Sequence, residues 1–245
     1  DLGLKVRVTY FGLPNENLAA LSRQVVVTNI SDQPISFELL DGLSQLLPTG
    51  VSQHGIKMLA NLTRSWMEVY NLEDNVGYYR MRSSSADTAE VVENEDGHFY
   101  VSTVNDVLIK PIVDQRLIFG MDTTKRRARH FEQHSIKDIL KEPQVTANKI
   151  PVGFTGLEAH LEPQNTLQLN TLIGHIHTVE YLLEIKNKIA KTAYVHKKRQ
   201  EADCEIEGLL EEVSTKSAFP IFDDYIKQNY LDNMLRGGYP LIIEG

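Results

Sequence analysis

The chain has 245 residues, of which 42% are hydrophobic, and it carries a formal net charge of −8. Its length allows one large domain or two smaller ones, and its apolar content is sufficient for a packed core. The negative charge argues against nucleic acid as the main partner, because phosphate binding needs a basic surface. No apolar run approaches the ~20 residues of a membrane span, so we expect neither nucleic acid nor a membrane as a partner.

The cysteine content bears on the cellular location. Cys204 is the single cysteine, so an internal disulfide cannot form and nothing points to an oxidising compartment. No signal peptide is visible, although the first residue is not Met. We therefore expect a cytoplasmic protein.

The first part of the chain predicts strands. Residues 4–11 alternate apolar and polar side chains, which is typical of a half-buried strand. Residues 22–30 are rich in β-branched side chains, and residues 35–40 form the next apolar run. Turn residues lie between these two runs, so the pattern predicts a β-hairpin over residues 22–40.

A long segment without clear periodicity follows. Residues 43–62 are expected to form a functional loop, or a loop with a short helix near residues 56–62. Residues 66–72 and 78–82 then predict two strands that flank a turn at residues 73–77.

The stretch up to residue 177 predicts more strands and only short helices. Residues 83–96 are polar and acidic, and we expect them to be exposed. Residues 121–150 are irregular, with short helices expected at 124–131 and 136–140. The total of about nine or ten strands makes an antiparallel sandwich the default architecture. The further strands are expected at residues 98–104, 111–119, 157–161 and 166–177.

Helical spacing replaces the strand pattern after residue 177. Residues 179–189 suit a helix, and residues 199–213 form a clearer amphipathic helix, which must bury its apolar stripe on the sandwich, on another domain or on a partner subunit. Pro220 can open a final helix, and Gly237 supplies the left-handed residue that commonly ends one. One face of this final helix carries Phe222, Tyr225, Ile226, Tyr230 and Met234.

A new apolar segment starts at residues 241–243, directly after this helix. We therefore expect the chain to be the front part of a larger protein, with most of its chemistry beyond residue 245. The pattern predicts three parts, a β domain over residues 1–177, a helical linker over 178–220 and the start of a further helical domain over 221–245.

Two pairs of histidines have the spacing of metal ligands. His175 and His177 would lie on one face of a strand, and His130 and His134 are four residues apart, as on one face of a helix. Neither pair has a cysteine or a carboxylate nearby in the sequence at ligand spacing. Surface or hydrogen-bonded histidines are the simpler interpretation, and we expect no metal.

Other signals of chemistry are weak. The sequence contains no G-x-S-x-G, no P-loop and no dinucleotide fingerprint. Two basic runs, at residues 125–130 and 196–199, are interpreted as solvated faces.

The end of the final helix offers candidate contacts to a sugar or a phosphate. Arg236 lies beside Gly237 and Gly238, where a ligand can approach closely for a charge-assisted contact. Asp232 and Asn233 lie in the same turn and could bind sugar hydroxyls. The alternative is structural: Arg236 and Asn233 cap the helix, and Asp232 pairs with Arg236.

Arg64 and Trp66 follow the long loop and are two further candidates for substrate binding. The face of a tryptophan can stack on a pyranose ring. A core position is the alternative, because most tryptophans are largely buried.

Three stretches, at residues 37–51, 61–68 and 230–240, together with the order of sandwich, helical linker and new helical start, resemble the cellobiose-phosphorylase-like enzymes. These are inverting glycoside phosphorylases and their hydrolase relatives. In that family an N-terminal β supersandwich of the galactose-mutarotase type is joined by linker helices to a six-hairpin α/α barrel, which holds the active site. The resemblance implies a supersandwich over residues 1–177 and the start of the barrel at residues 221–245.

The resemblance also implies a reaction, the phosphorolysis of a β-glucoside to a sugar 1-phosphate. One carboxylic acid protonates the leaving oxygen, and phosphate attacks from the opposite face in place of the water of an inverting hydrolase. The family's catalytic acid belongs to the barrel, so no catalytic residue is assigned and this chain alone is expected to be inactive. The implied partners are an oligosaccharide and inorganic phosphate as co-substrate, without a further cofactor, and a homodimer.

Two alternatives remain open. The parent protein could be a glycoside hydrolase of the same architecture, in which a second carboxylate replaces the phosphate site. The chain could also be a non-catalytic module for carbohydrate binding or assembly.

Overall fold

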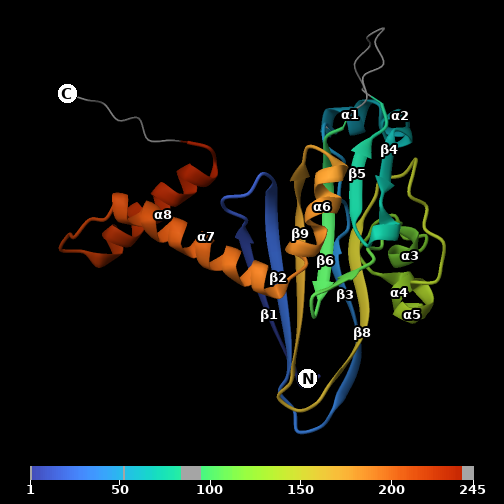
Figure 1. Cartoon of the computed structure of the whole chain (residues 1–245), viewed down its shortest axis with the longest axis horizontal. Coiled ribbons are helices and arrows are strands. Elements are labelled where there is room, and N and C mark those ends of the chain that lie inside the picture. Colours follow the sequence, from blue (N-terminus) through green and yellow to red (C-terminus); the bar gives the residue numbers. More distant parts are fainter. Residues whose placement is uncertain (1, 52, 84–94, 239–245) are drawn as a thin grey trace. The chain divides into compact units, whose positions relative to one another are not determined.

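The computed structural model describes residues 2–51, 53–83 and 95–238 (Figure 1). The chain divides into two compact units, residues 1–195 and 196–245. The described part contains nine strands, all within the first unit, and their ladders are antiparallel. The expectation of a mainly β fold is therefore confirmed. None of the helices described is both long and apolar enough to cross a membrane.

The larger of two sheets contains seven strands, β1 (Leu4–Gly12), β2 (Ala19–Asn29), β4 (Met67–Tyr70), β5 (Gly77–Met81), β6 (Gly97–Val104), β7 (Val107–Ile109) and β9 (Thr166–Ile176). Six of them follow the order β1, β2, β9, β6, β5 and β4, and β7 pairs with β6. The last strand in the sequence, β9, thus lies in the middle of the sheet, between β2 and β6 (Figure 1).

The smaller sheet contains β3 (Ile35–Leu43) and β8 (Gly153–Leu161), which pair along their whole length. Both sheets contribute to one buried cluster, so they share a core. A largely buried ion pair between Arg23 of β2 and Asp41 of β3 also links them. The shared cluster is formed by Val25, Val27, Leu161 and Leu169, with Phe37 and Leu39 packed against it.

The opposite face of the larger sheet is covered by α6 (Val179–Ile189). In β6 the side chains alternate between the two faces, as the pleat of a strand requires. Phe99 packs in the cluster of α6, whereas Tyr100 lies in a different buried cluster. Thr178 caps α6, because its hydroxyl accepts a hydrogen bond from Tyr181 N–H at 3.3 Å. The helix buries Leu182, Ile185 and Ile189.

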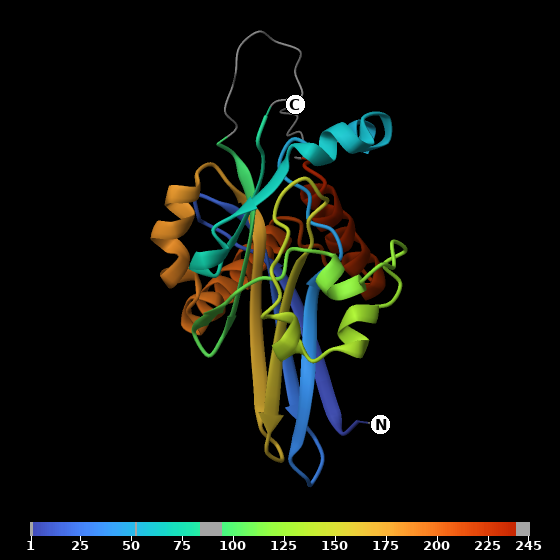
Figure 2. The same ribbon diagram turned by 90° about the vertical axis from the view of Figure 1, so that its right-hand side faces the viewer.

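In the described part of the first unit the strands are connected by a short 3-10 helix, η1 (Leu72–Asp74), and by five short α-helices. These are α1 (Gln53–Met58), α2 (Ala60–Ser65), α3 (Arg116–Phe119), α4 (Arg129–Gln133) and α5 (Ile136–Ile139). The segment with α3 to α5 has its own core, in which Ile118, Ile136 and Ile139 are almost completely buried. Leu40 of β3 and Phe154 of β8 pack against this core, so α3 to α5 lie beside the smaller sheet (Figure 2).

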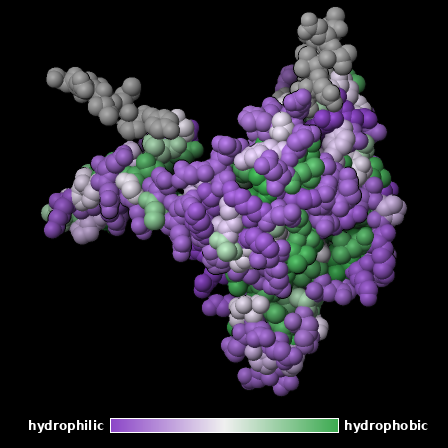
Figure 3. All heavy atoms as spheres, in the orientation of Figure 1, coloured by the Kyte–Doolittle hydropathy of each residue, from purple (hydrophilic) through white to green (hydrophobic). Residues whose placement is uncertain are grey.

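The second unit is helical. The long helix α7 (Thr192–Glu212) begins in the first unit and continues into the second, and α8 (Pro220–Leu235) follows. Asp223 fixes the start of α8, since its carboxylate accepts hydrogen bonds from Thr215 Oγ1 at 2.6 Å and from Ser217 N–H. No residue of α8 is buried. Most of the surface in Figure 3 is hydrophilic, with smaller hydrophobic areas between the hydrophilic ones.

The β-hairpin predicted over residues 22–40 is wrong. β2 and β3 both form, but they belong to different sheets, and β2 pairs with β1 and β9 instead. Asn29 holds the crossing between the sheets, because its side-chain amide donates to Gln33 O at 2.8 Å and to Leu161 O at 2.9 Å. The turn residues between β2 and β3 are as compatible with a connection from one sheet to the other as with a hairpin turn.

The strand predicted over residues 111–119 is also wrong. Only Ile112 forms a bridge, with Phe154, and residues 116–119 form α3. A short apolar run does not distinguish a strand from a buried helical turn. The buried face predicted for the first strand is wrong too: Val6 and Tyr10 are each 58% exposed on β1, the edge strand of its sheet. The polar stretch predicted to be exposed lies largely outside the described residues.

Candidate functional site

A cavity of about 710 Å³ opens beside α2 in the first unit. The residues that line it are mainly cationic or carry amides, and no carboxylate is among the described residues of this lining. Such a surface offers positive charge and hydrogen-bond donors, which suit a phosphate or the hydroxyls of a sugar. The lining consists of Arg64, Lys125, Lys149, Gln45, Asn61, Gln115, Asn148, Thr123 and Ile150.

One wall of the cavity is α2, which carries Asn61 and Arg64. Thr63 anchors this helix to the preceding one. Its N–H donates to Leu59 O at 2.8 Å, and its hydroxyl donates to Gly55 O at 3.1 Å. Thr63 is itself buried, so these bonds fix the backbone next to Arg64.

A second wall is the segment that follows α3. Asp122 shapes it, since its carboxylate accepts hydrogen bonds from Thr124 N–H at 2.9 Å and from the Thr124 hydroxyl at 2.6 Å. Lys125 follows in the left-handed region, with φ of 54°. Its ammonium donates to Ser44 O at 2.8 Å, which holds the cation against the chain that leaves β3.

The third wall is the segment before β8, which contributes Asn148 and Lys149. Asn148 N–H donates to Met67 O at 3.0 Å, and its side-chain oxygen accepts from Arg82 at 2.6 Å. Arg82 also donates to Ser65 O at the end of α2. These bonds connect two walls of the cavity through a single guanidinium group.

Gln115 lies in the cavity lining directly before α3, where Asp114 fixes the chain. The Asp114 carboxylate is fully buried and accepts hydrogen bonds from Arg116 N–H at 3.0 Å and from Val145 N–H at 2.9 Å. Burial acts to raise the pKa of Asp114, but hydrogen bonds from the Arg116 side chain and from the Val145 backbone outweigh it. The pKa therefore lies below its ordinary value.

The cavity carries positive charge that its own residues do not neutralise. The pKa of Lys125 is lowered, first by burial and then by repulsion from Arg64. Neither Arg64 nor Lys149 has an ion-pair partner in the part of the chain that the structure describes. An anion bound here would relieve this repulsion, so the arrangement favours a negatively charged ligand.

Arg64 is thus a predicted site residue that lies in the cavity, whereas Trp66 is not part of the described lining. Trp66 is half-buried at the end of α2, where its N–H donates to Thr63 O at 3.3 Å and its carbonyl accepts from Arg82 N–H at 2.8 Å. Stacking of Trp66 on a sugar stays a prediction.

The other five predicted site residues come together at the end of α8, in the second unit. Arg236 forms an ion pair with Asp232 at 3.1 Å. Gly237 adopts φ of 82° and its N–H donates to Met234 O, while Gly238 N–H donates to Asn233 O at 2.9 Å. These are helix-end contacts, and binding of a ligand by this cluster stays a prediction.

Of the two histidine pairs, His130 and His134 are engaged within their own segment. The rings are stacked with 4.1 Å between their centroids, and His130 Nε2 lies 2.9 Å from the Glu142 carboxylate.

Sequence reasoning missed most of the cavity. Lys125 begins the basic run that was interpreted as a solvated face, and its contribution depends on the left-handed backbone and on Ser44. Gln115, Asn148 and Lys149 carry no signal in the sequence, because they approach α2 only through the fold.

No family model matches the chain, and no curated protein matches it. Among solved structures the chain is similar to one named "Putative kojibiose phosphorylase from human microbiome". The TM-score is 0.26 and the identity is 12%, and the match covers 94% of this chain and 23% of that one. The chain thus spans less than a quarter of that protein, and a TM-score this low does not establish a shared fold.

Proposed function

We propose that residues 1–245 are the N-terminal part of a carbohydrate-active enzyme that resembles the inverting glycoside phosphorylases. We further propose that the cavity beside α2 binds the phosphate and hydroxyl groups of its substrates. The observation that carries this proposal is the lining of the cavity, with three cations and four amides and, among the described residues, no carboxylate.

The order of the elements supports the first part of the proposal. Two sheets with a shared core precede three longer helices, α6, α7 and α8. The resembling family has a supersandwich, linker helices and a barrel in this order. We therefore keep residues 1–177, 178–220 and 221–245 as the proposed parts.

The chemistry of the lining supports phosphate as the co-substrate. A guanidinium group can bind a phosphate through two parallel hydrogen bonds, and a lysine adds a point charge. Arg64 and Lys125 provide these two groups, and the amides of Gln45 and Asn61 can contact sugar hydroxyls.

The remaining parts of the proposal concern regions outside the cavity. Arg236, Asp232 and Asn233, with the two glycines beside them, are proposed as further contacts to an oligosaccharide. The catalytic acid is proposed to belong to a barrel beyond this chain. A homodimer and a cytoplasmic location stay predictions.

Equilibrium binding tests the proposal on this chain. We expect inorganic phosphate and glucose 1-phosphate to bind at low salt in titration calorimetry. Arg64→Gln should weaken binding by about tenfold or more, because a charge-assisted hydrogen bond is lost. Arg7→Gln, on the exposed edge strand β1, is the matched control and should bind like the wild type. Equal binding by both variants would remove the cavity from the proposal.

A second experiment addresses the reaction in the longer protein that the proposal requires. Acceptor-dependent release of phosphate from α-glucose 1-phosphate would establish a phosphorylase. Cleavage of a β-glucan in phosphate-free buffer would instead favour the hydrolase. Binding of sugars without either reaction would favour a non-catalytic module.

A further inference from the structure

Four side chains with metal-binding chemistry meet at one end of the β6–β9 ladder. In this antiparallel pair His98 lies opposite His175, and Gly97 lies opposite Ile176. The same register places Asp96 opposite His177. Directly opposed residues and residues two apart share one face of a sheet, so the carboxylate and the three imidazoles lie on the same face.

The distances show that three of these groups converge. Asp96 Oδ1 lies 2.8 Å from His177 Nδ1. The ligand atoms of Asp96, His175 and His177 all lie within 4.8 Å of one another. The rings of His175 and His177 meet edge to face, at 89° and 5.2 Å between centroids, so one ring does not stack over the other.

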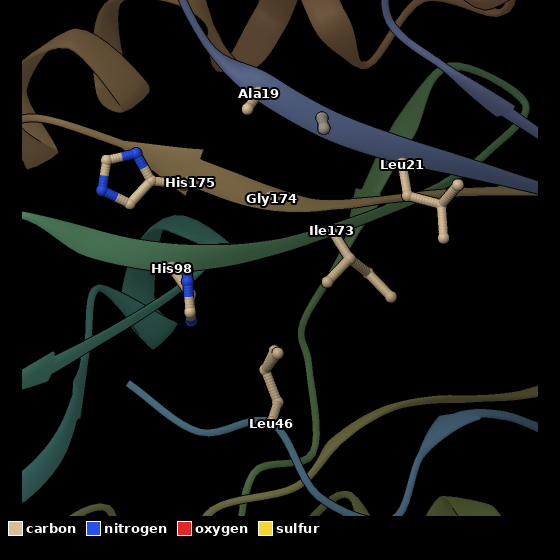
Figure 4. Close-up of a pocket in the computed structure, with 8 residues that line it drawn as sticks. Ala19, Leu21, Leu46, His98, Ile173, Gly174 and His175 are labelled. Carbon is tan, nitrogen blue, oxygen red and sulfur yellow. The ribbon is translucent and has the colours of Figure 1, made fainter. Parts of the chain in front are cut away.

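His98 lies next to this group but is engaged differently. Its ring centroid is 5.9 Å from that of His175, and the two rings extend from neighbouring strands (Figure 4). His98 Nδ1 forms a 2.6 Å hydrogen bond with Leu47 O. The cluster thus borders a cavity of about 430 Å³, which is lined by Ala19, Ala20, Leu21, Leu46, His98, Ile173, Gly174 and His175.

We propose that Asp96, His175 and His177 bind a divalent first-row transition-metal ion such as Zn²⁺. Two imidazoles and one carboxylate are a common donor set for these ions. Ligand atoms about 2.0–2.2 Å from a tetrahedral ion are roughly 3.3 Å apart. The Asp96–His177 separation of 2.8 Å is shorter than this value, and no separation among the three exceeds 4.8 Å, so side-chain rotations would have to bring the three atoms to the ion.

The exposure of the three groups suits an ion that enters from solvent. Asp96 and His177 are exposed and His175 is half-buried, which leaves the remaining coordination position to water. An ordinary surface ion pair would need only Asp96 and His177 and contributes little to stability. Such an ion pair does not explain why a third metal-binding side chain, His175, lies beside the other two.

The ion would connect two segments that are far apart in the sequence. Asp96 immediately precedes β6, whereas His177 follows β9 and precedes Thr178, the cap of α6. A bound ion would therefore fasten the end of the ladder at the point where the chain leaves the sheet for the helix.

Titration of the chain with ZnCl₂, followed by calorimetry, tests this site. We expect one Zn²⁺ per chain and a rise in the midpoint of thermal unfolding when Zn²⁺ is added. Loss of an outer-shell partner typically costs about 10–100-fold in metal affinity. Loss of a direct ligand in His177→Ala or Asp96→Asn should therefore cost at least about 100-fold and abolish the thermal shift.

His160→Ala is the matched control. His160 is also an exposed strand histidine beside a carboxylate, since it lies 2.9 Å from the Ser36 hydroxyl and 3.3 Å from Glu162. This variant should bind Zn²⁺ like the wild type. Circular dichroism verifies that each variant is folded, and Asp96→Asn preserves the size of the side chain. Absence of saturable binding, or equal affinity in the control and the two ligand variants, would overturn the proposal.

Discussion

The Arg23 guanidinium of β2 binds the Asp41 carboxylate of β3 through two hydrogen bonds, at 3.1 Å from Nε and 2.5 Å from Nη2. The two side chains are 19% and 9% exposed. Because β2 and β3 belong to different sheets, this pair is a polar connection across the shared core. A charge held here without its partner would be poorly solvated.

Asp41→Asn should therefore destabilise the chain by roughly 3 kcal/mol, as expected when one partner of a largely buried ion pair is removed. Urea unfolding at neutral pH measures this change. Replacement of both partners, Arg23→Met with Asp41→Leu, should recover much of the loss, because no unpaired charge remains. If Asp41→Asn alone unfolds at the same urea concentration as the wild type, the ion pair contributes little to stability.

Gly174 permits the close approach of β2 to β9. A Cβ atom at this position would lie 2.0 Å from Ala19 O and 2.7 Å from Ala20 Cα. Gly174→Ala should force these strands apart and cost about 3 kcal/mol or more in the free energy of unfolding. Gly12→Ala in β1 meets no atom within 4 Å and should be nearly neutral. Similar losses in the two variants would contradict the steric explanation.

Asp114 should make stability depend on pH in acid. A carboxyl group whose pKa is lowered by folding stabilises the protein above its unfolded-state pKa of about 3.9, and this contribution is lost as pH falls through the folded-state value. Asp114→Asn should cost roughly 2 kcal/mol at pH 7.

The difference between this variant and the wild type should shrink below about pH 4, because the wild-type carboxyl then becomes protonated. Unfolding curves from pH 7 to pH 2 measure it. Asp32→Asn, at an exposed position, should follow the wild type throughout. A difference that stays constant with pH would mean that the Asp114 charge is not responsible.

Lys125 should make the affinity of the cavity for anions decrease at alkaline pH. Its pKa is lowered by burial and by repulsion from Arg64, so its charge is lost at a lower pH than that of an ordinary lysine. Sulfate is the suitable probe, since its own charge is constant in this range. Titrations from pH 7 to pH 10 should show a larger decrease in the wild type than in Lys125→Arg, whose side chain stays charged.

The strands and helices with strong local patterns could be predicted from the sequence. β6 and β9, the antiparallel pair β4 and β5, and helix α6 form at the places predicted. What the sequence does not specify is which strands pair. β2 finds its partner β9 across some 140 intervening residues, and no local pattern encodes such a choice.

The candidate sites depend on the same long-range information. Arg64 could be predicted as a candidate because it follows an unusual loop, but Lys125 and Lys149 join it only through the fold. The pair His175 and His177 was visible in the sequence. Asp96 was not, because it lies 81 residues before His177 and reaches it through the register of β6 and β9.

The central position of β9 has a consequence for synthesis of the chain. β1 and β2 can pair as soon as residue 29 has emerged, but the inner edge of β2 stays without a strand partner until β9 has been made. At about 5–20 residues per second, this interval lasts roughly 7–30 s. An unpaired strand edge is a template for association with other chains, so the nascent protein needs protection over this interval. A chain whose synthesis stopped at residue 165 would lack β9, and the inner edge of β2 would stay unpaired.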